Sequence, residues 1–157
     1  MKHIKKYNLF EAISIKPDIY KYIDANDFES FKEFVTDYDN FSRLDTIYNG
    51  WTPLTYCIVF KSEFATLLID YGADPNATTT KSLITQQITP LLYASYDDNM
   101  VLIRKLIDVG ADWFPVDNNN KTFFDNLQNS DKNIIKTEYP KQYRKYKQLK
   151  KVKKFNL

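Results

Sequence analysis

Two stretches of the sequence, Thr52-Pro53-Leu54-Thr55-Tyr56-Cys57 and Thr89-Pro90-Leu91-Leu92-Tyr93-Ala94, follow one pattern and decide the fold. Each is followed by the same closing triplet, Gly72-Ala73-Asp74 in the first case and Gly110-Ala111-Asp112 in the second. A degraded third copy begins at Thr122, 33 residues after the second, whereas the first two copies start 37 residues apart. A recurrence at this spacing indicates a stack of similar structural units, with a short insertion between the first two.

Each copy predicts a helix, a turn and a second helix. Thr before Pro is a favourable helix start, because the Thr side chain accepts a hydrogen bond from a first-turn amide and Pro lacks an N–H that would have no partner there. We therefore expect Thr52 and Thr89 to cap first helices, and Ser62 to cap a second helix. Gly72 and Gly110 fit the left-handed position at which helices end. One helix pair cannot bury its apolar face alone, so the pairs must stack.

These residues resemble the ankyrin repeat, whose most recognisable parts are this period and these opening and closing triplets. The clear resemblance covers residues 49–128. It implies an all-α ankyrin-repeat solenoid of about four helix-turn-helix repeats, with imperfect caps at both ends and a basic C-terminal helix. Trp113-Phe114 departs from the family's usual residues and predicts local repacking around the last hairpin, while Ile134 and Ile135 are expected to close the core.

A weaker copy precedes the clear ones and predicts an N-terminal capping repeat. Pro17 stands at its helix-opening position, and the apolar residues from 28 to 35 have the spacing of a second helix. Thr55 and Leu92 stand where the family usually has His, so a hydrogen bond that braces successive hairpins is absent or replaced. We expect residues 1–16 to form a lead-in segment, 17–138 the repeat domain (about 17–48, 49–85, 86–118 and 119–138), and 139–157 a basic tail that is helical.

The scarce residues exclude most catalytic chemistry. The chain of 157 residues has one histidine, His3, and one cysteine, Cys57, which together cannot form a Cys/His zinc site or an intramolecular disulfide. Its three glycines are isolated, which excludes a phosphate-binding loop. We expect no enzyme activity, no cofactor and no metal, and an inert, buried Cys57.

Charge is divided unevenly along the chain. Residues 1–140 contain 14 Lys and Arg against 20 Asp and Glu, a formal charge of −6. The remaining residues have no acidic side chain and eight basic ones: Lys141, Arg144, Lys145, Lys147, Lys150, Lys151, Lys153 and Lys154. Tyr143, Tyr146, Leu149 and Val152 recur every three residues among them, which gives a drifting apolar stripe.

Three interpretations of this tail are open. A final helix can pack its Tyr/Leu edge on the last repeat and leave the lysines in solvent, which is favoured because charge runs are usually solvated. The lysines can instead contact nucleic-acid phosphates or an acidic protein partner. The tail can also lie on the acidic body of its own chain.

No apolar run approaches the roughly 18 residues of a membrane-spanning helix. The N-terminus also lacks the apolar stretch of a signal peptide. We therefore expect a cytoplasmic protein, in its own cell or in a host cell, that is monomeric when free and does not bind membranes.

The family resemblance implies a concave binding surface made from the hairpin tips and the exposed sides of the first helices. The partner-binding candidates are Tyr48, Asn49, Trp51, Phe60, Thr85, Gln86, Ile88, Tyr96, Asp97, Asn118, Asn119 and Lys121. Trp51 is the best single candidate, since Trp is enriched in binding hot spots; alternatively it packs on the next hairpin or on the insert at 78–87. That insert either belongs to the binding face or is neutral. Asp97-Asp98 predicts a solvated turn, or else part of an acidic patch.

These observations predict a non-catalytic protein–protein interaction module that acts as an adaptor or inhibitor. A small stand-alone repeat array is expected in three kinds of protein. These are an immunity protein that neutralises a toxin, a viral or bacterial effector, and a regulatory subunit. The alternative is binding of nucleic acid or an acidic partner through the Lys-rich tail.

Overall fold

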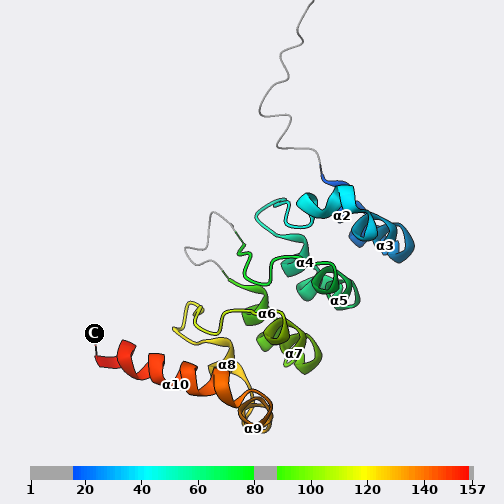
Figure 1. Ribbon diagram of the computed structural model, residues 1–157. Coiled ribbons are helices and arrows are strands. Elements are labelled where there is room, and N and C mark those ends of the chain that lie inside the picture. Colours follow the sequence, from blue (N-terminus) through cyan, green and yellow to red (C-terminus); the bar gives the residue numbers. More distant parts are fainter. Residues whose placement is uncertain (1–15, 80–87, 156–157) are drawn as a thin grey trace, which may run out of the picture.

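Helices stack in pairs along the part of the chain that the computed structural model describes, residues 16–79 and 88–155 (Figure 1). The pairs are α2 (Asp18–Ala25) with α3 (Phe28–Thr36), α4 (Pro53–Phe60) with α5 (Ser62–Asp70), and α6 (Pro90–Tyr96) with α7 (Met100–Asp108). A short α8 (Phe123–Asn126) and α9 (Asn129–Glu138) follow, and α10 (Pro140–Phe155) ends the array. A 3-10 helix, η1 (Tyr38–Arg43), comes after α3.

The helices form two rows. In the first row, which we call the inner row, α2 contacts α4, α4 contacts α6, and α6 contacts α8. In the outer row, α3 contacts α5, and α5 contacts α7. Isolated bridges, Tyr48 with Trp51 and Val116 with Thr122, stand in place of strands among the described residues. The expected all-α solenoid is confirmed.

The first helices begin as the Thr-Pro pattern predicts. The Oγ1 atoms of Thr52 and Thr89 accept hydrogen bonds from the backbone N–H groups three residues later, at 3.2 and 3.4 Å. Thr122 does the same at 3.3 Å in the degraded copy, although Phe123 replaces the proline. Three equivalent caps therefore start three successive units of the inner row.

Of the other predicted helix starts, that of α5 is wrong and that of α2 is right. The N-cap of α5 is Lys61, and Ser62 is already its first helical residue. Lys61 donates its backbone N–H to the carbonyl of Cys57 at 2.8 Å, so one residue serves both as the end of α4 and as the start of α5. Pro17 opens α2 as predicted, as the N-cap residue before Asp18.

The second helices end as predicted. Gly72 and Gly110 have φ values of +85° and +95°, in the left-handed region that L side chains rarely adopt. The following backbone N–H groups turn back to the carbonyls of Leu68 and Leu106, at 3.0 and 2.9 Å. This geometry satisfies carbonyls that would otherwise lack a partner at the end of each helix.

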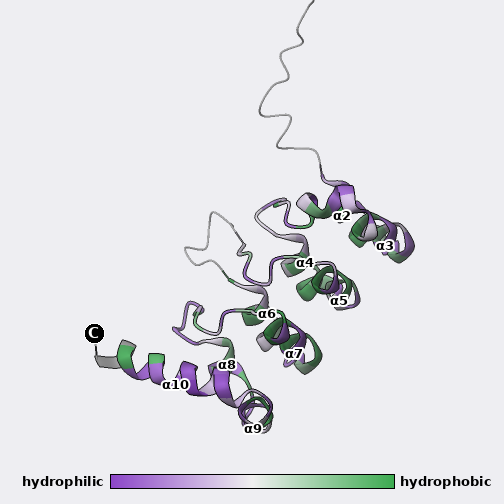
Figure 2. Cartoon of the chain, in the orientation of Figure 1, coloured by the Kyte–Doolittle hydropathy of each residue, from purple (hydrophilic) through white to green (hydrophobic). Residues whose placement is uncertain are grey.

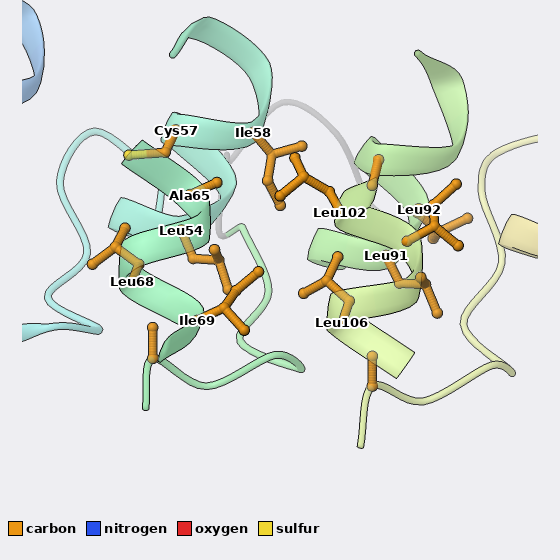
Figure 3. Packing of buried hydrophobic residues seen from close by; sticks show 14 of the residues in the cluster. Leu54, Cys57, Ile58, Ala65, Leu68, Ile69, Leu91, Leu92, Leu102 and Leu106 are labelled. Atoms are coloured by element: carbon orange, nitrogen blue, oxygen red, sulfur yellow. The ribbon is translucent and has the colours of Figure 1, made fainter. Parts of the chain in front are cut away.

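The core lies within and between the pairs. Leu54 and Cys57 of α4 are fully buried, as the spacing on one helix face predicts. Ile58 and Ile69 point toward the next pair, from which Leu102 and Leu106 point back (Figure 3). Each pair thus buries on its neighbour the apolar surface that it cannot cover alone.

Side chains brace successive units from the hairpin side. Oδ1 of Asp45 accepts from the backbone N–H of Asp74 at 3.0 Å, and Oδ1 of Asn76 accepts from that of Asp112 at 2.7 Å. The Thr55 hydroxyl is engaged locally with Thr52, and Leu92 has no polar group to offer. Asp45 and Asn76 therefore join successive units from the hairpin side.

The last unit is short and is completed by aromatic residues. Trp113 is buried against Phe123, with the ring centroids 5.0 Å apart, and against Tyr146 at 6.0 Å. Trp113 is therefore part of the core beside the last hairpin. Ile135 closes the core as expected, but Ile134 is 36% exposed, because the two residues are adjacent on α9 and point in different directions.

Candidate functional site

Aromatic side chains line the inner row over two successive units. We call Tyr48, Trp51, Tyr56, Phe60, Tyr93 and Tyr96 the aromatic strip. Trp51 lies at its centre, with ring centroids 6.2 Å from Tyr56, 5.7 Å from Phe60 and 5.5 Å from Tyr93. Further contacts join Tyr56 to Phe60 at 4.7 Å and Tyr93 to Tyr96 at 6.1 Å. The rings therefore form one continuous surface from α4 to α6.

The helical spacing explains why these rings share a face. Tyr56 follows the buried Leu54 and precedes the buried Cys57, and so lies on the other side of α4. Phe60 comes four residues after Tyr56 and lies on the same side. Tyr93 and Tyr96 repeat this arrangement on α6, three residues apart.

A tight turn fixes Trp51. Its backbone exchanges two hydrogen bonds with Tyr48, at 2.9 and 3.0 Å, across a two-residue loop. Both loop residues, Asn49 and Gly50, have positive φ, as this kind of hairpin turn requires. The Oη of the buried Tyr20 donates to the Trp51 carbonyl at 2.6 Å and ties the turn to α2.

The strip is partly open to solvent. Phe60 is 55% exposed and Tyr96 is 45% exposed, while Trp51, Tyr56 and Tyr93 are half-buried. Trp51 packs on Tyr93 of the next unit and is half-buried, so it contributes to the stack. Contiguous apolar surface of this kind marks interaction sites more often than scattered exposed residues do.

Hydrogen bonds hold the tyrosines at both ends of the strip. Tyr56 Oη donates to Asp24 Oδ1 at 2.7 Å, and Lys16 pairs with the same carboxylate. Tyr96 Oη donates to Asp117 Oδ2 at 3.5 Å. Burial, followed by the Asp117 charge, raises the pKa of Tyr96 to about 12, so the phenol remains a neutral donor.

Asp117 organises the last hairpin. Its Oδ1 accepts from the backbone N–H groups of Asn119 at 2.8 Å and Lys121 at 3.0 Å. Burial raises the pKa of Asp117, but these N–H groups outweigh it and lower the net value. The carboxylate therefore stays ionised and fixes the turn beside the strip.

The structure brings together only part of the predicted site. Tyr48, Trp51, Phe60 and Tyr96 lie in the strip, and Asp97 is exposed directly after it. Asn49 is exposed on the Trp51 turn, and Asn118, Asn119 and Lys121 are exposed on the third hairpin, while Ile88 is half-buried against the core. Thr85, Gln86 and most of the 78–87 insert lie outside the described residues.

Sequence reasoning missed Tyr56 and Tyr93. They occupy the same position in the two opening hexapeptides, which is the signal that could have found them. The solvated turn predicted at Asp97-Asp98 is present only at Asp97, which is exposed.

Asp98 is half-buried with φ +48°, and its Oδ2 accepts from Gln128 Nε2 at 2.8 Å.

The described residues offer nothing that points to catalysis. Cys57 is fully buried, and burial raises the pKa of its thiol well above the usual range. Groups of three or more His, Cys, Asp or Glu that could hold a metal ion do not occur in residues 16–79 and 88–155. Over the same residues, every helix is too short or too polar to cross a membrane.

The family comparison matches this architecture. Residues 49–80 match the family model described as Ankyrin repeat. This segment is an ankyrin repeat. It comprises the Trp51 turn, α4 and α5, and the same helix pair recurs in α6 and α7.

A solved structure resembles part of the chain. A crystal structure of the ankyrin repeat domain of Bcl-3, described as a unique member of the IkappaB protein family, is similar at 23% identity with a TM-score of 0.48. The match covers 58% of this chain and 40% of that one. No curated protein sequence matches the chain.

The basic helix α10 packs on this ankyrin array through two tyrosines. Tyr146 is 4% exposed and contacts Phe124 at 5.4 Å, and Tyr143 contacts the same ring at 5.3 Å. Lys150 Nζ donates to Asp125 Oδ2 at 2.6 Å. The predicted packing edge is therefore present at the tyrosines, and one lysine of the tail also binds an acid of the body.

Proposed function

We propose that this ankyrin array is a non-catalytic module that binds one folded partner protein through the aromatic strip and the neighbouring hairpin tips. Ankyrin repeats are generally protein–protein interaction modules. The observation that carries the proposal is the strip itself, a continuous row of partly exposed rings across two repeats. Asn49, Asp97, Asn118, Asn119 and Lys121 supply polar groups around it.

The strip has the composition and rigidity of a binding hot spot. Trp and Tyr bury a large area with few rotatable bonds, so little side-chain entropy is lost on binding. Here the contacts of Trp51 with Phe60 and Tyr93, and the bonds of Tyr56 and Tyr96 to carboxylates, hold the rings before a partner arrives. Preorganisation of this kind raises affinity, because the ordering cost is already met in the free protein.

A rigid binding surface that catalyses no reaction affects its partner only by covering part of it or by holding it next to another protein. If the partner's own functional surface faces the strip, the chain inhibits that partner, as an immunity protein does for a toxin or an effector does for a host protein. If the hairpin tips and the strip hold different proteins, the chain is an adaptor. The inhibitor role is the simpler of the two, since one continuous surface serves it.

Quantitative capture of partners from the native source tests the proposal. Phe60→Ala and Tyr96→Ala remove exposed rings of the strip, and Tyr38→Ala removes a ring that is 84% exposed on η1, away from the strip. We expect one protein to be recovered with the wild type and with Tyr38→Ala, and to be lost with the two strip variants, with or without nuclease. Equal recovery with all four proteins, or recovery that disappears with nuclease, would overturn the proposal.

A further inference from the structure

The apolar stripe of α10 is at least partly buried up to Tyr146 and exposed beyond it. Tyr143 and Tyr146 pack on the body, but Leu149 is 39% exposed and Val152 is 53% exposed. Figure 1 shows the far end of α10 extending away from the helix pairs, and Figure 2 shows apolar positions near that end of a helix that is otherwise largely polar. The far half of α10 thus presents apolar side chains that the described part of the chain, residues 16–79 and 88–155, does not cover.

These apolar residues continue a groove that begins against the body. Lys145 precedes Leu149 by four residues and Val152 by seven, so all three lie on one helix face, which we call the α10 face. Lys145 and Gln142 also line a groove whose opposite wall includes Gly110, Asp112, Trp113 and Phe114. The α10 face therefore begins at this groove, next to Trp113 and Phe114, and continues along the helix to the exposed Leu149 and Val152.

The charge around this face has one sign on the helix. Lys141 and Arg144 are exposed on α10, which has no acidic residue. Lys147 and Lys151 are exposed on the side of Phe124 and Tyr143, where Lys150 is engaged by Asp125. The acid of the groove wall, Asp112, accepts the backbone N–H of Phe114 at 3.1 Å. Beyond Lys150, which Asp125 binds, the helix runs on to Phe155, about 8 Å further at 1.5 Å per residue, close to the distance over which charges act at physiological salt. The acidic body therefore offsets the positive charge least at this end.

We propose that the α10 face docks an acidic amphipathic segment of a protein. Its apolar side chains would cover Leu149 and Val152, and its carboxylates would meet Lys145 on the same face. This site is separate from the aromatic strip and does not depend on the function proposed for it.

The exposed residue types favour a protein segment over nucleic acid. Binding of single strands relies on bases that stack on aromatic rings, but Tyr146 is buried and Tyr143 packs on Phe124. Among the α10 side chains that the structure describes, the apolar ones that remain exposed, Leu149 and Val152, are aliphatic and offer no such platform. A second copy of α10 is a poor occupant as well, because two basic helices would repel each other.

Fluorescence anisotropy of the full chain with a designed probe tests the docking site. The probe is a labelled peptide of about 16 residues, rich in Glu, with Leu at helical i, i+3, i+4 and i+7 positions. A second peptide has the same charge with Ala in place of Leu, and a labelled single-stranded oligonucleotide serves as the polyanion. The variants are Leu149→Ala combined with Val152→Ala, and Lys145→Glu. Lys151→Glu makes the same charge change on the opposite side of α10, where Lys151 lines a hollow with Phe124 and Tyr143.

We expect the Leu-containing peptide to bind the wild type, and the double variant and Lys145→Glu each to weaken binding about tenfold or more. Lys151→Glu should weaken it less than about threefold, and Trp51→Ala should leave it unchanged, which separates this site from the aromatic strip. The inference is overturned if the peptide does not bind, if both peptides bind equally, or if Lys145→Glu and Lys151→Glu have equal effects. Tighter binding of the oligonucleotide, insensitive to Leu149 and Val152, would assign α10 to nucleic acid instead.

Discussion

Asn76 and Asp112 join two successive repeats through a hydrogen bond of 2.7 Å from the backbone N–H of Asp112 to the side-chain Oδ1 of Asn76. Nδ2 of the same side chain donates to the Gly110 carbonyl at 3.4 Å. Asp45 makes the corresponding bond to Asp74, the third residue of the preceding Gly-Ala-Asp triplet. These two exposed polar side chains therefore contribute to the alignment of successive hairpins.

Replacement of Asn76 by Ala should lower the free energy of unfolding by about 1 kcal/mol, the usual net value of such a hydrogen bond. Urea unfolding measures this as a lower midpoint with an unchanged slope. Asn118→Ala, on the exposed tip of the third hairpin, is the matched control and should have little effect. Equal midpoints for the two variants would show that the bond between repeats does not contribute to stability.

The Thr caps of the inner row should contribute different amounts to the free energy of unfolding. Thr89→Ala removes one cap bond and should cost about 1 kcal/mol. Thr122→Ala should cost about 2 kcal/mol, because the Thr122 hydroxyl also bonds Tyr146 Oη at 2.8 Å and Asp125 Oδ2 at 2.9 Å. Chemical denaturation of both variants measures the difference, and a smaller loss for Thr122→Ala would contradict the proposed attachment of α10.

Asp125 should make stability depend on pH in the acid range. Burial raises the pKa of Asp125, but hydrogen bonds from Lys150 and Thr122 outweigh it and lower the net value. A folded-state pKa below the unfolded one gives stability that is present above about pH 4 and is lost as the pH falls through the folded value. We expect Asp125→Asn to be less stable than the wild type at neutral pH, with the difference shrinking toward about pH 2. A constant difference from neutral pH to acid would show that ionisation of Asp125 does not matter.

Cys57 should react with a thiol reagent only when the chain unfolds. Its side chain is fully buried, and burial raises the thiol pKa well above the usual range, so little reactive thiolate exists in the folded state. As the chain has a single cysteine, mass spectrometry during labelling reports on this site alone. Labelling should accelerate with urea in parallel with unfolding. Rapid modification in the absence of urea would mean that the α4–α5 pair opens locally.

The sequence was most informative where its pattern repeats. Thr52 and Thr89 predicted the starts of α4 and α6, and Gly72 and Gly110 predicted the ends of α5 and α7, because each residue type answers a local requirement of the backbone. Ser62 was misplaced because the turn before α5 is a single residue, which the identity of Ser62 does not reveal.

The candidate site was only half visible in the sequence. Trp51, Phe60 and Tyr96 were named from their place in the repeat, but Tyr56 and Tyr93 were not. Whether those rings are covered depends on contacts between repeats, such as the one from Trp51 to Tyr93. In the same way, the stripe of α10 indicated an apolar edge, but the position of Phe124 decides that Tyr146 is buried and Leu149 is not.

The central claim is that a partner protein covers the aromatic strip, and site-specific photocrosslinking tests it most directly. A photoreactive phenylalanine analogue at Phe60 would lie on the strip, and the same analogue at Tyr38 would lie off it. In lysate of the native source, we predict one crosslinked protein of defined mass from position 60 and none of that mass from position 38. The same adduct from both positions, or none from position 60 when the partner is otherwise retained, would contradict the account.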